Sequence, residues 1–233
     1  MKAMILAAGR GERMRPLSDR MPKPLLEVGG YRLIDFHLAA LRKAGIHEVV
    51  VNLSWLGDQI REALGGGGRH GLSIAYSAEG PVPLGTGGGI HRALPLLGGD
   101  PFLLVNGDIW IDLPFDELRR SAGSLAHLVL VPNPAQHPGG DYGLSANGHV
   151  QSAPTPLTYS GLAILDPRLF DGCEAGASPL KPLLDRALAA GKLTGQQHQG
   201  TWSDVGTPER LAALDSALRL GQVRHPVLES PVG

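Results

Sequence analysis

The first polar residues of the chain follow a short apolar run, and their types suit a bound phosphate. Residues 4–8 are apolar, and Gly9 and Gly11 then form a Gly-x-Gly turn. Arg13 and Lys23, which stands between two prolines, add two positive charges shortly after the turn. Backbone N–H groups at a glycine turn can approach a phosphate closely, and both cations would serve the same ligand. This stretch therefore predicts a binding loop for a nucleoside triphosphate.

Two better-known glycine signatures do not fit this stretch. The P-loop requires Gly-Lys-Ser or Gly-Lys-Thr after its glycines, and Arg13 stands where that sequence would begin. The dinucleotide-binding fingerprint requires a third glycine at position 14, which is Met14. A lone Gly-x-Gly pair is usually only a turn. The phosphate-binding interpretation therefore depends on Arg13 and on the Pro-Lys-Pro sequence around Lys23.

Two aspartates provide a candidate metal site. Asp108 ends the sequence Leu-Leu-Val-Asn-Gly-Asp, and Asp204 lies in Trp-Ser-Asp-Val-Gly-Thr-Pro. Each could serve only to stabilise a local turn. Neither has an adjacent cationic partner, however, and Mg²⁺ takes one or two protein carboxylates together with phosphate oxygens and water. Asp108 and Asp204 together therefore predict a Mg²⁺ site.

Apolar runs and helical periodicities alternate along the chain, which is typical of an α/β fold. The runs predict strands at 4–8, 48–52, 72–76, 101–108, 126–131 and 157–165. The periodic segments predict helices at 33–41, 59–64, 87–97, 180–190 and 208–214, the last with Thr207 as its N-cap. We expect a Rossmann-like, doubly wound mixed sheet in a single domain over residues 1–221, followed by a flexible tail at 222–233.

The expected sheet would bring several polar residues together. Gly9, Asn52 and Asp108 each come at the carboxyl end of a predicted strand. In a doubly wound fold the ligand lies beyond these ends. We therefore expect the glycine turn and the first aspartate to face one cleft.

Composition excludes several classes of function. The chain has 233 residues, 42% of them hydrophobic, which suits one domain with a sizeable core. A net charge of −1 gives no electrostatic basis for a nucleic-acid partner or an anionic membrane. Cys173 is the only cysteine, which excludes an internal disulfide and favours a reducing compartment. No apolar run approaches the ~20 residues of a membrane span. We expect a cytoplasmic monomer or small homo-oligomer.

Residues 3–24 resemble the N-terminal signature of the sugar-1-phosphate nucleotidylyltransferases, and the later motifs extend this resemblance over nearly the whole chain. The resemblance implies a GT-A-like nucleotidyltransferase domain, with Arg13, Lys23 and Asp108 as catalytic residues and Mg²⁺ on Asp108 and Asp204. The implied nucleotide site consists of Ala7, Ala8, Gly9, Gly11, Arg13, Lys23, Glu79, Gly85, Thr86 and Gly87. The implied sugar-phosphate site consists of Asn106, Asp141, Tyr142, Gly143, Ser160 and Gly161.

One segment departs from the family pattern. Many relatives carry Glu-Lys-Pro between the Tyr-Gly and Ser-Gly motifs, and its lysine contacts the sugar phosphate. This chain has Ser-Ala-Pro-Thr-Pro at 152–156 instead. Lys181 or Arg168 is a candidate for the missing charge. The departure counts against simply transferring glucose or mannose 1-phosphate specificity to this chain.

The implied reaction joins a sugar 1-phosphate to an NTP and releases pyrophosphate. The attacking phosphate oxygen is already an anion, so catalysis requires positioning and charge neutralisation rather than a general base. Within the family, the motifs are most similar to the uridylyltransferases that act on N-acetylmuramate α-1-phosphate in peptidoglycan recycling, with UTP as the second substrate. Mannose-1-phosphate guanylyltransferase and glucose-1-phosphate thymidylyl- or uridylyltransferase are alternatives. A non-catalytic nucleotide-sensing subunit is an alternative of another class.

Overall fold

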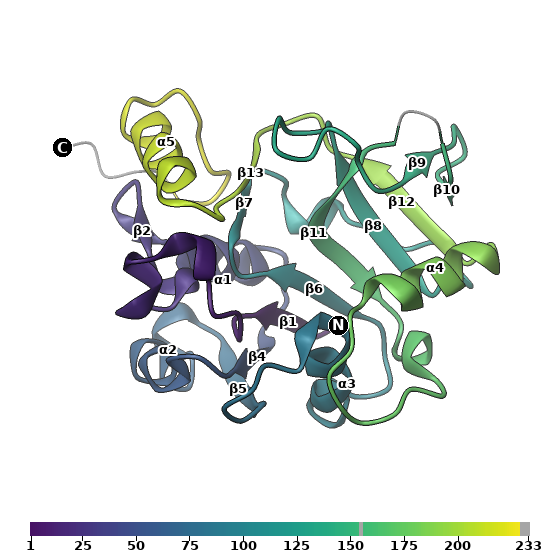
Figure 1. Ribbon diagram of the computed structural model, residues 1–233, viewed down its shortest axis with the longest axis horizontal. Helices are drawn as coiled ribbons and strands as arrows, with labels where there is room; N and C mark the ends of the chain where they lie inside the picture. The colour runs from purple at the N-terminus through teal and green to yellow at the C-terminus, as the bar shows by residue number, and fades with distance from the viewer. Residues whose placement is uncertain (154–155, 229–233) are drawn as a thin grey trace.

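A seven-stranded sheet is the centre of the computed structural model, which describes residues 1–153 and 156–228 (Figure 1). In the described residues the strand order is β12-β8-β11-β6-β1-β4-β5. β11 runs antiparallel to β6 and β8, and the other neighbouring strands are parallel. The strands of this sheet are β1 (Ala3–Leu6), β4 (Glu48–Leu53), β5 (Ser73–Ala78), β6 (Phe102–Asn106), β8 (Ala126–Val131), β11 (Thr158–Leu165) and β12 (Leu193–Gln197). The expected mixed α/β sheet is confirmed.

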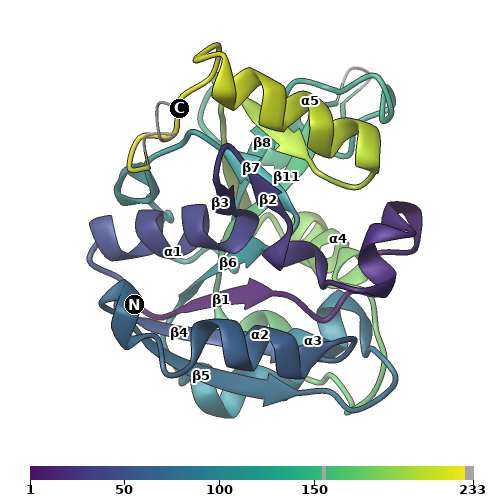
Figure 2. The same cartoon turned by 90° about the vertical axis from the view of Figure 1, so that its left-hand side faces the viewer.

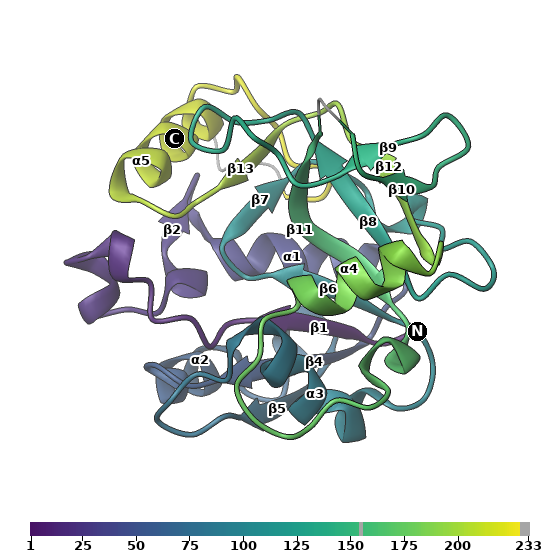
Figure 3. The same ribbon diagram turned by 45° about the vertical axis from the view of Figure 1, so that its right-hand side comes forward.

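Helices cover both faces of the sheet, because successive residues of a strand point to opposite faces. Ala3 and Ile5 of β1 pack with α1 (Leu33–Lys43) and α2 (Gly57–Leu64), which lie in front of the sheet in Figure 2. Met4, between them, packs on the other face with α3 (Gly85–Leu97) and α4 (Lys181–Ala189), which Figure 3 shows. Both faces of the strands are therefore apolar, as expected for a doubly wound fold.

Smaller elements surround the carboxyl edge of the sheet. β2 (Glu27–Val28) and β3 (Tyr31–Arg32) form a hairpin, β7 (Ile109–Ile111) pairs with β13 (Trp202–Asp204), and β9 (Gly143–Leu144) pairs with β10 (Val150–Gln151). α5 (Pro208–Arg219) begins at its expected N-cap, Thr207, whose side chain accepts a hydrogen bond from Arg210 N. One-turn 3₁₀ helices occupy residues 12–14, 17–19, 23–25, 68–70, 115–117 and 167–170.

The beginning of the expected tail packs against a third apolar cluster. His225 is 6% exposed, and its ring lies 5.0 Å from that of Phe36, centre to centre. Val223 and Leu228 pack against the same cluster, which includes residues of α5. The rest of the expected tail, 229–233, lies outside the described residues. No helix of the described chain is long and apolar enough to cross a membrane.

Candidate active site

The carboxyl ends of β1, β4 and β6 meet at one edge of the sheet, where three neighbouring cavities form one cleft. Asn106, at the end of β6, lines all three. Their volumes are about 210, 730 and 380 Å³. We call them the first, second and third cavities. The cleft thus lies where ligands bind in doubly wound folds.

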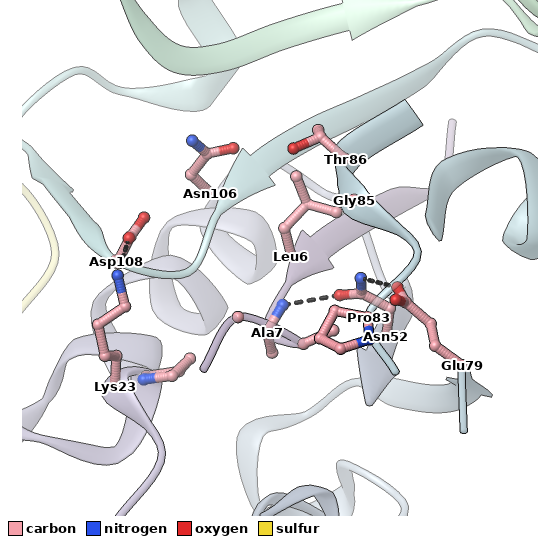
Figure 4. A pocket seen from close by; sticks show the side chains of 13 residues that line it. Leu6, Ala7, Lys23, Asn52, Glu79, Pro83, Gly85, Thr86, Asn106 and Asp108 are labelled. Atoms are coloured by element: carbon pink, nitrogen blue, oxygen red, sulfur yellow. Dashed lines mark hydrogen bonds and ion pairs between the residues drawn. The ribbon is translucent and has the colours of Figure 1, made fainter. Parts of the chain in front are cut away.

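The first cavity is lined by the end of β1 and by the loop that opens α3. Ala7, Ala8 and Gly9 belong to its lining, and so do Gly85 and Thr86. In Figure 4, Ala7 lies on one side of the cavity and Gly85 and Thr86 lie on the other. Lys23, Asn52, Glu79, Asn106 and Asp108 complete its polar lining. The structure thus brings Gly9 of the expected glycine turn, Lys23 and Asp108 to one cavity.

A chain of hydrogen bonds fixes the walls of the first cavity (Figure 4). Ala7 N donates to Asn52 Oδ1 over 2.7 Å, and Asn52 Nδ2 donates to Glu79 Oε1 over 2.6 Å. The second oxygen of Glu79 accepts from Leu84 N over 2.7 Å, directly before α3. Glu79, which is only 8% exposed, therefore joins three separate segments of the cavity wall. This network directly supports a positioning role for Glu79.

Gly11 allows the side chain of Lys23 to pass close to the backbone. Its φ of +66° is in the left-handed region, which glycine adopts readily. A Cβ at this position would lie 2.9 Å from Cγ of Lys23. Ser18 Oγ donates to Gly11 O over 2.7 Å and holds the turn in place. Gly11 does not line the three cavities, and it acts on the cleft through Lys23.

The two expected metal-binding aspartates come together because their strands pair. Asp204 lies opposite Ile109, the residue after Asp108, and Val205 N donates to Asp108 O over 2.8 Å. Both aspartates and Arg13 line the third cavity. Arg13 is therefore placed with the two carboxylates rather than in the first cavity.

The expectation that these aspartates lack cationic partners is wrong. Lys23 Nζ donates to Oδ2 of Asp108, and Arg210 Nη1 donates to Oδ2 of Asp204 over 2.7 Å. The sequence shows no sign of the first pair, since its residues are 85 positions apart. Arg210 follows Asp204 by six positions, and only the turn into α5 brings it back to the aspartate.

Asn106, which lines both the second and third cavities, packs against Gly161, which lines the third. Gly161 has a φ of +86°, and a Cβ there would lie 2.6 Å from Nδ2 of Asn106. The register of β11 against β8 shifts in the same stretch. Ser160, which is fully buried, lines the third cavity, and its carbonyl accepts a hydrogen bond from Trp202 Nε1. Only a glycine therefore allows Asn106 to pack here without displacement.

Asp141 and Tyr142 reach the cleft from the segment before β9. Asp141 lines the second and third cavities, and its Oδ2 accepts from Tyr159 N over 2.8 Å. Tyr142 lines the second cavity and donates through its hydroxyl to Asp185 over 3.0 Å. Burial, together with the neighbouring Asp185, raises the pKa of Tyr142 well above its usual value. Tyr142 is therefore a neutral donor at all ordinary pH values.

Of the two candidates for the missing sugar-side cation, the structure places only Lys181 at the cleft. Lys181 lines the second cavity, and its Nζ lies 2.8 Å from both carboxylate oxygens of Asp185. Arg168 forms a two-pronged contact with Asp166 and lines none of the three cavities. Of the segment that replaces Glu-Lys-Pro, residues 154–155 lie outside the described residues.

Two expected site glycines serve packing and do not line the cleft. A Cβ at Gly87 would lie 2.7 Å from Pro179 O, and one at Gly143 would lie 2.3 Å from Cβ of Ala153. Neither residue lines any of the three cavities. Gly87 lets α3 approach the segment before α4, and Gly143 lets β9 approach the residues after β10.

Asn52, Tyr159 and Arg210 have polar contacts or positions at the cleft that the expected site did not include. Asn52 was expected only as the end of a strand, and its link to Glu79 depends on the pairing of β4 with β5. Tyr159 lines the second and third cavities, and its buried hydroxyl has no hydrogen-bond partner among the described residues. Arg210 lines none of the three cavities and reaches the site through its hydrogen bond to Asp204. The only sequence signal for Tyr159 is its position directly before the Ser-Gly motif.

Comparisons with known proteins agree with this geometry. A family model described as "nucleotidyl transferase" matches residues 2–153. An N-acetylmuramate alpha-1-phosphate uridylyltransferase from Neisseria meningitidis serogroup B is 51% identical over 220 residues, covering 91% of this chain and 95% of the relative. One from Caulobacter vibrioides is 36% identical and covers 93% of this chain and 96% of the relative. A solved structure of a putative glucose-1-phosphate thymidylyltransferase from Bacillus anthracis superposes with a TM-score of 0.80 at 20% identity, covering 93% and 94% of the two chains. At that identity the superposition supports the fold alone.

Proposed function

The chain belongs to the nucleotidyl transferase family, and we propose that it transfers the uridylyl group of UTP to N-acetylmuramate α-1-phosphate, with release of pyrophosphate. The observation that carries the chemistry is the meeting of Arg13, Lys23, Asp108 and Asp204 in one cleft. The choice of base and sugar rests on the names of two relatives that align over nearly their whole length.

The cavities suggest how the two substrates divide the cleft. The first cavity is lined by Gly9, by Lys23 and by the Gly85–Thr86 loop, which suits a nucleotide. The second cavity contains Asp141 and Asn106, whose side chains can hydrogen-bond sugar hydroxyl and amide groups. The third cavity, with Arg13, Asp108 and Asp204, is proposed to receive phosphate groups. Asn106 lines all three cavities, so the reacting phosphates are proposed to meet beside it.

The residues present fit a divalent metal ion. Lys23 and Arg210 bind Oδ2 of Asp108 and Asp204, and in the described chain no protein group donates a hydrogen bond to Oδ1 of either aspartate. Two anionic substrates would bring additional negative charge beside these two carboxylates, and a divalent cation would offset it. No group of three or more His, Cys, Asp or Glu side chains in the described residues could hold a metal, so phosphate oxygens and water would complete the coordination. Bound Mg²⁺ would neutralise phosphate charge.

The proposed step requires no proton transfer. An oxygen of the sugar 1-phosphate attacks the α-phosphorus of UTP in line, and the bond from that phosphorus to the bridging oxygen breaks. Pyrophosphate leaves with the electron pair. Arg13 is proposed to hold the leaving phosphates and Lys23 to stabilise charge on the α-phosphate. Positioning and fixed positive charge thus account for the catalysis.

A matrix of substrates tests the proposal. Pyrophosphate release is measured with Mg²⁺ for UTP, dTTP, GTP, CTP and ATP, each with the 1-phosphates of N-acetylmuramate, N-acetylglucosamine, glucose and mannose. We expect a sharp maximum for UTP with N-acetylmuramate α-1-phosphate, and mass spectrometry should identify UDP-N-acetylmuramate as the product. The use of an intracellular nucleotide agrees with the expected cytoplasmic location.

The other outcomes are equally informative. A maximum for GTP with mannose 1-phosphate, or for dTTP or UTP with glucose 1-phosphate, would keep the chemistry and overturn the proposed substrates. If a folded protein that binds UTP released no pyrophosphate with any substrate pair, a nucleotide-sensing role would be favoured. A nucleotide-sensing role would not explain why Arg13, Lys23, Asp108 and Asp204, the residues proposed for catalysis, all lie in one cleft.

A further inference from the structure

A fourth cavity, away from the cleft, has four arginine and lysine side chains in its lining. It has a volume of about 550 Å³ and shares no residue with the three cavities of the cleft. It is formed by α1, the β2–β3 hairpin, the 3₁₀ helix at 68–70 and residues 227–228. Its charged and titratable lining residues are Arg32, Asp35, Arg42, Lys43, Arg69 and His70. We call it the basic cavity.

The lining of the basic cavity has more positively charged side chains than carboxylates that could neutralise them. Arg32 is paired with Asp35 through two hydrogen bonds of 2.9 and 3.1 Å. Arg42, Lys43 and Arg69 have no carboxylate partner among the described residues, and the last two donate only to backbone carbonyls, those of Pro226 and Ala63. Within the described residues, three cations without a carboxylate partner therefore line one cavity of a chain whose net charge is −1.

His70 also lines the basic cavity. Burial lowers the pKa of His70, and Arg32 and Arg69 lower it further, against the opposing effect of Asp35. His70 therefore lies close enough to Arg32, Asp35 and Arg69 to interact with all three charges. A neutral His70 can still donate or accept one hydrogen bond.

α1 positions two of these cations, Arg42 and Lys43, in the absence of a ligand. Asp35, Ala39, Arg42 and Lys43 follow the spacing that places residues on one face of a helix. The guanidinium of Arg42 lies against Gly71, where a Cβ would be 3.0 Å from its Nε. A side chain at position 71 would thus crowd Arg42, and its absence lets the arginine lie across the cavity wall.

We propose that the basic cavity is a second ligand site, which binds the phosphate groups of a small phosphorylated molecule. Guanidinium groups match phosphate oxygens with pairs of hydrogen bonds, and the cavity offers Arg42 and Arg69 for this purpose. Tyr31 and Leu228 add an apolar part to the wall, which suits an organic phosphate ester. The site is independent of the proposed function, since no cleft residue belongs to it.

Calorimetric titration with inorganic tripolyphosphate tests this site. The titrated protein is the Arg13→Ala/Lys23→Ala chain, in which the proposed phosphate-binding groups of the cleft are removed. We expect one bound tripolyphosphate per chain, with a Kd below about 1 mM that weakens as salt is raised. Adding Arg42→Gln and Arg69→Gln should weaken this binding by about tenfold or more.

Two further variants separate a phosphate site from a general effect of charge. Arg42→Lys with Arg69→Lys should retain part of the affinity, because the charge remains and the paired hydrogen bonds are lost. Arg92→Gln removes an exposed arginine of α3, on the other face of the sheet, and should leave the Kd unchanged. Unchanged thermal unfolding shows that each protein is folded. Equal Kd values with and without Arg42→Gln and Arg69→Gln would overturn the proposal, as would no binding by the Arg13→Ala/Lys23→Ala chain.

Discussion

The ammonium group of Lys23 donates a hydrogen bond to the carboxylate of Asp108, which lies 85 positions later in the chain. The side chain of Lys23 is 13% exposed and that of Asp108 is 28% exposed, so the pair stands at the border between protein and cleft. The proposed phosphate-binding lysine is thus joined to a proposed metal-binding aspartate. In the absence of ligands, each neutralises the charge of the other.

Lys23→Ala should abolish most of the catalysis. The lysine is proposed to stabilise charge that develops in the transition state, so kcat should fall by about 10²-fold or more while KM for UTP changes less. Steady-state pyrophosphate release measures both values. Lys192→Ala, which removes an exposed lysine far along the chain, should leave both unchanged. A folded Lys23→Ala protein with near-normal kcat would contradict the assigned role.

Asp204→Asn should increase the requirement for metal. The amide keeps one oxygen ligand and removes the negative charge, so the Mg²⁺ concentration for half-maximal activity should rise by about tenfold or more. EDTA should stop the reaction of the unmodified chain, and added Mg²⁺ should restore it. Asp215→Asn is the matched control, because Asp215 is an ion-paired aspartate of α5 that lines no cavity of the cleft. An unchanged Mg²⁺ requirement in Asp204→Asn would argue against a metal ligand at this position.

Local patterns in the sequence predict the sheet and its functional edge well. The strands at 48–52 and 126–131 are short apolar runs, and such runs depend only on neighbouring residues. Their alternation with helices is enough to place Asn52 and Asp108 at one edge. The expected strand at 4–8 extended too far, because β1 ends at Leu6, three residues before Gly9.

The charge pairing of the site could not be read from the same patterns. Lys23 meets Asp108 only through the folded path of the first 25 residues, and Arg210 meets Asp204 only through the turn into α5. The need for glycine at position 87 could not be predicted either. It arises because the backbone of Pro179, which is distant in sequence, lies where a Cβ of residue 87 would be. Contacts of this kind depend on how distant segments pack in the folded chain, and the spacing of residues within one segment does not predict that packing.

Glu79→Gln should destabilise the wall of the first cavity, although glutamine has nearly the same shape as glutamate. Both partners of Glu79, Asn52 Nδ2 and Leu84 N, are donors, so a glutamine must turn its own NH₂ group toward one of them. An unsatisfied buried donor costs about 1–3 kcal/mol. We expect a loss of this size in urea unfolding and a higher KM for UTP.

A control variant distinguishes this effect from simple loss of charge. Glu62→Gln removes an exposed glutamate of α2 and should change neither the free energy of unfolding nor KM. Stability of Glu79→Gln equal to that of the unmodified chain would show that the hydrogen-bond chain through Asn52 does not hold the cavity walls.

Gly161→Ala should impair the sugar side of the cleft. The new Cβ would lie 2.6 Å from Nδ2 of Asn106, so the asparagine must move. A displacement of about 1 Å near reacting groups can cost up to about 10²-fold in rate. We expect kcat/KM for the sugar 1-phosphate to fall by at least about tenfold, as measured with UTP held at saturation.

Gly172→Ala is the matched control for the backbone. Gly172 has a φ of +76°, similar to that of Gly161, but a Cβ there would have no atom within 4 Å. Both variants therefore carry the same left-handed backbone strain, and only Gly161→Ala displaces a cleft residue. Equal activities of the two proteins would mean that Asn106 does not contribute to the reaction.

The stability of the fold should decrease as the pH falls below neutrality, because buried histidines resist protonation. Burial lowers the pKa of His37 to about 4 and that of His225 to about 3. In the unfolded chain a histidine titrates near 6.5. The unfolded state therefore binds protons that the native state does not bind, from about pH 6.5 down to the native pKa values. The stabilisation is complete above pH 6.5 and is progressively lost as the pH falls toward 4.

His37→Leu tests the contribution of one histidine. By pH 4, His37 alone should account for a loss of up to about 3 kcal/mol in the free energy of unfolding. Urea unfolding between pH 7.5 and pH 4.5 should thus show a smaller loss of stability in His37→Leu than in the unmodified chain, with the part due to His225 remaining. His47→Gln, at an exposed histidine, should retain the full loss. Parallel pH profiles for His37→Leu and the unmodified chain would show that proton uptake at His37 is not linked to unfolding.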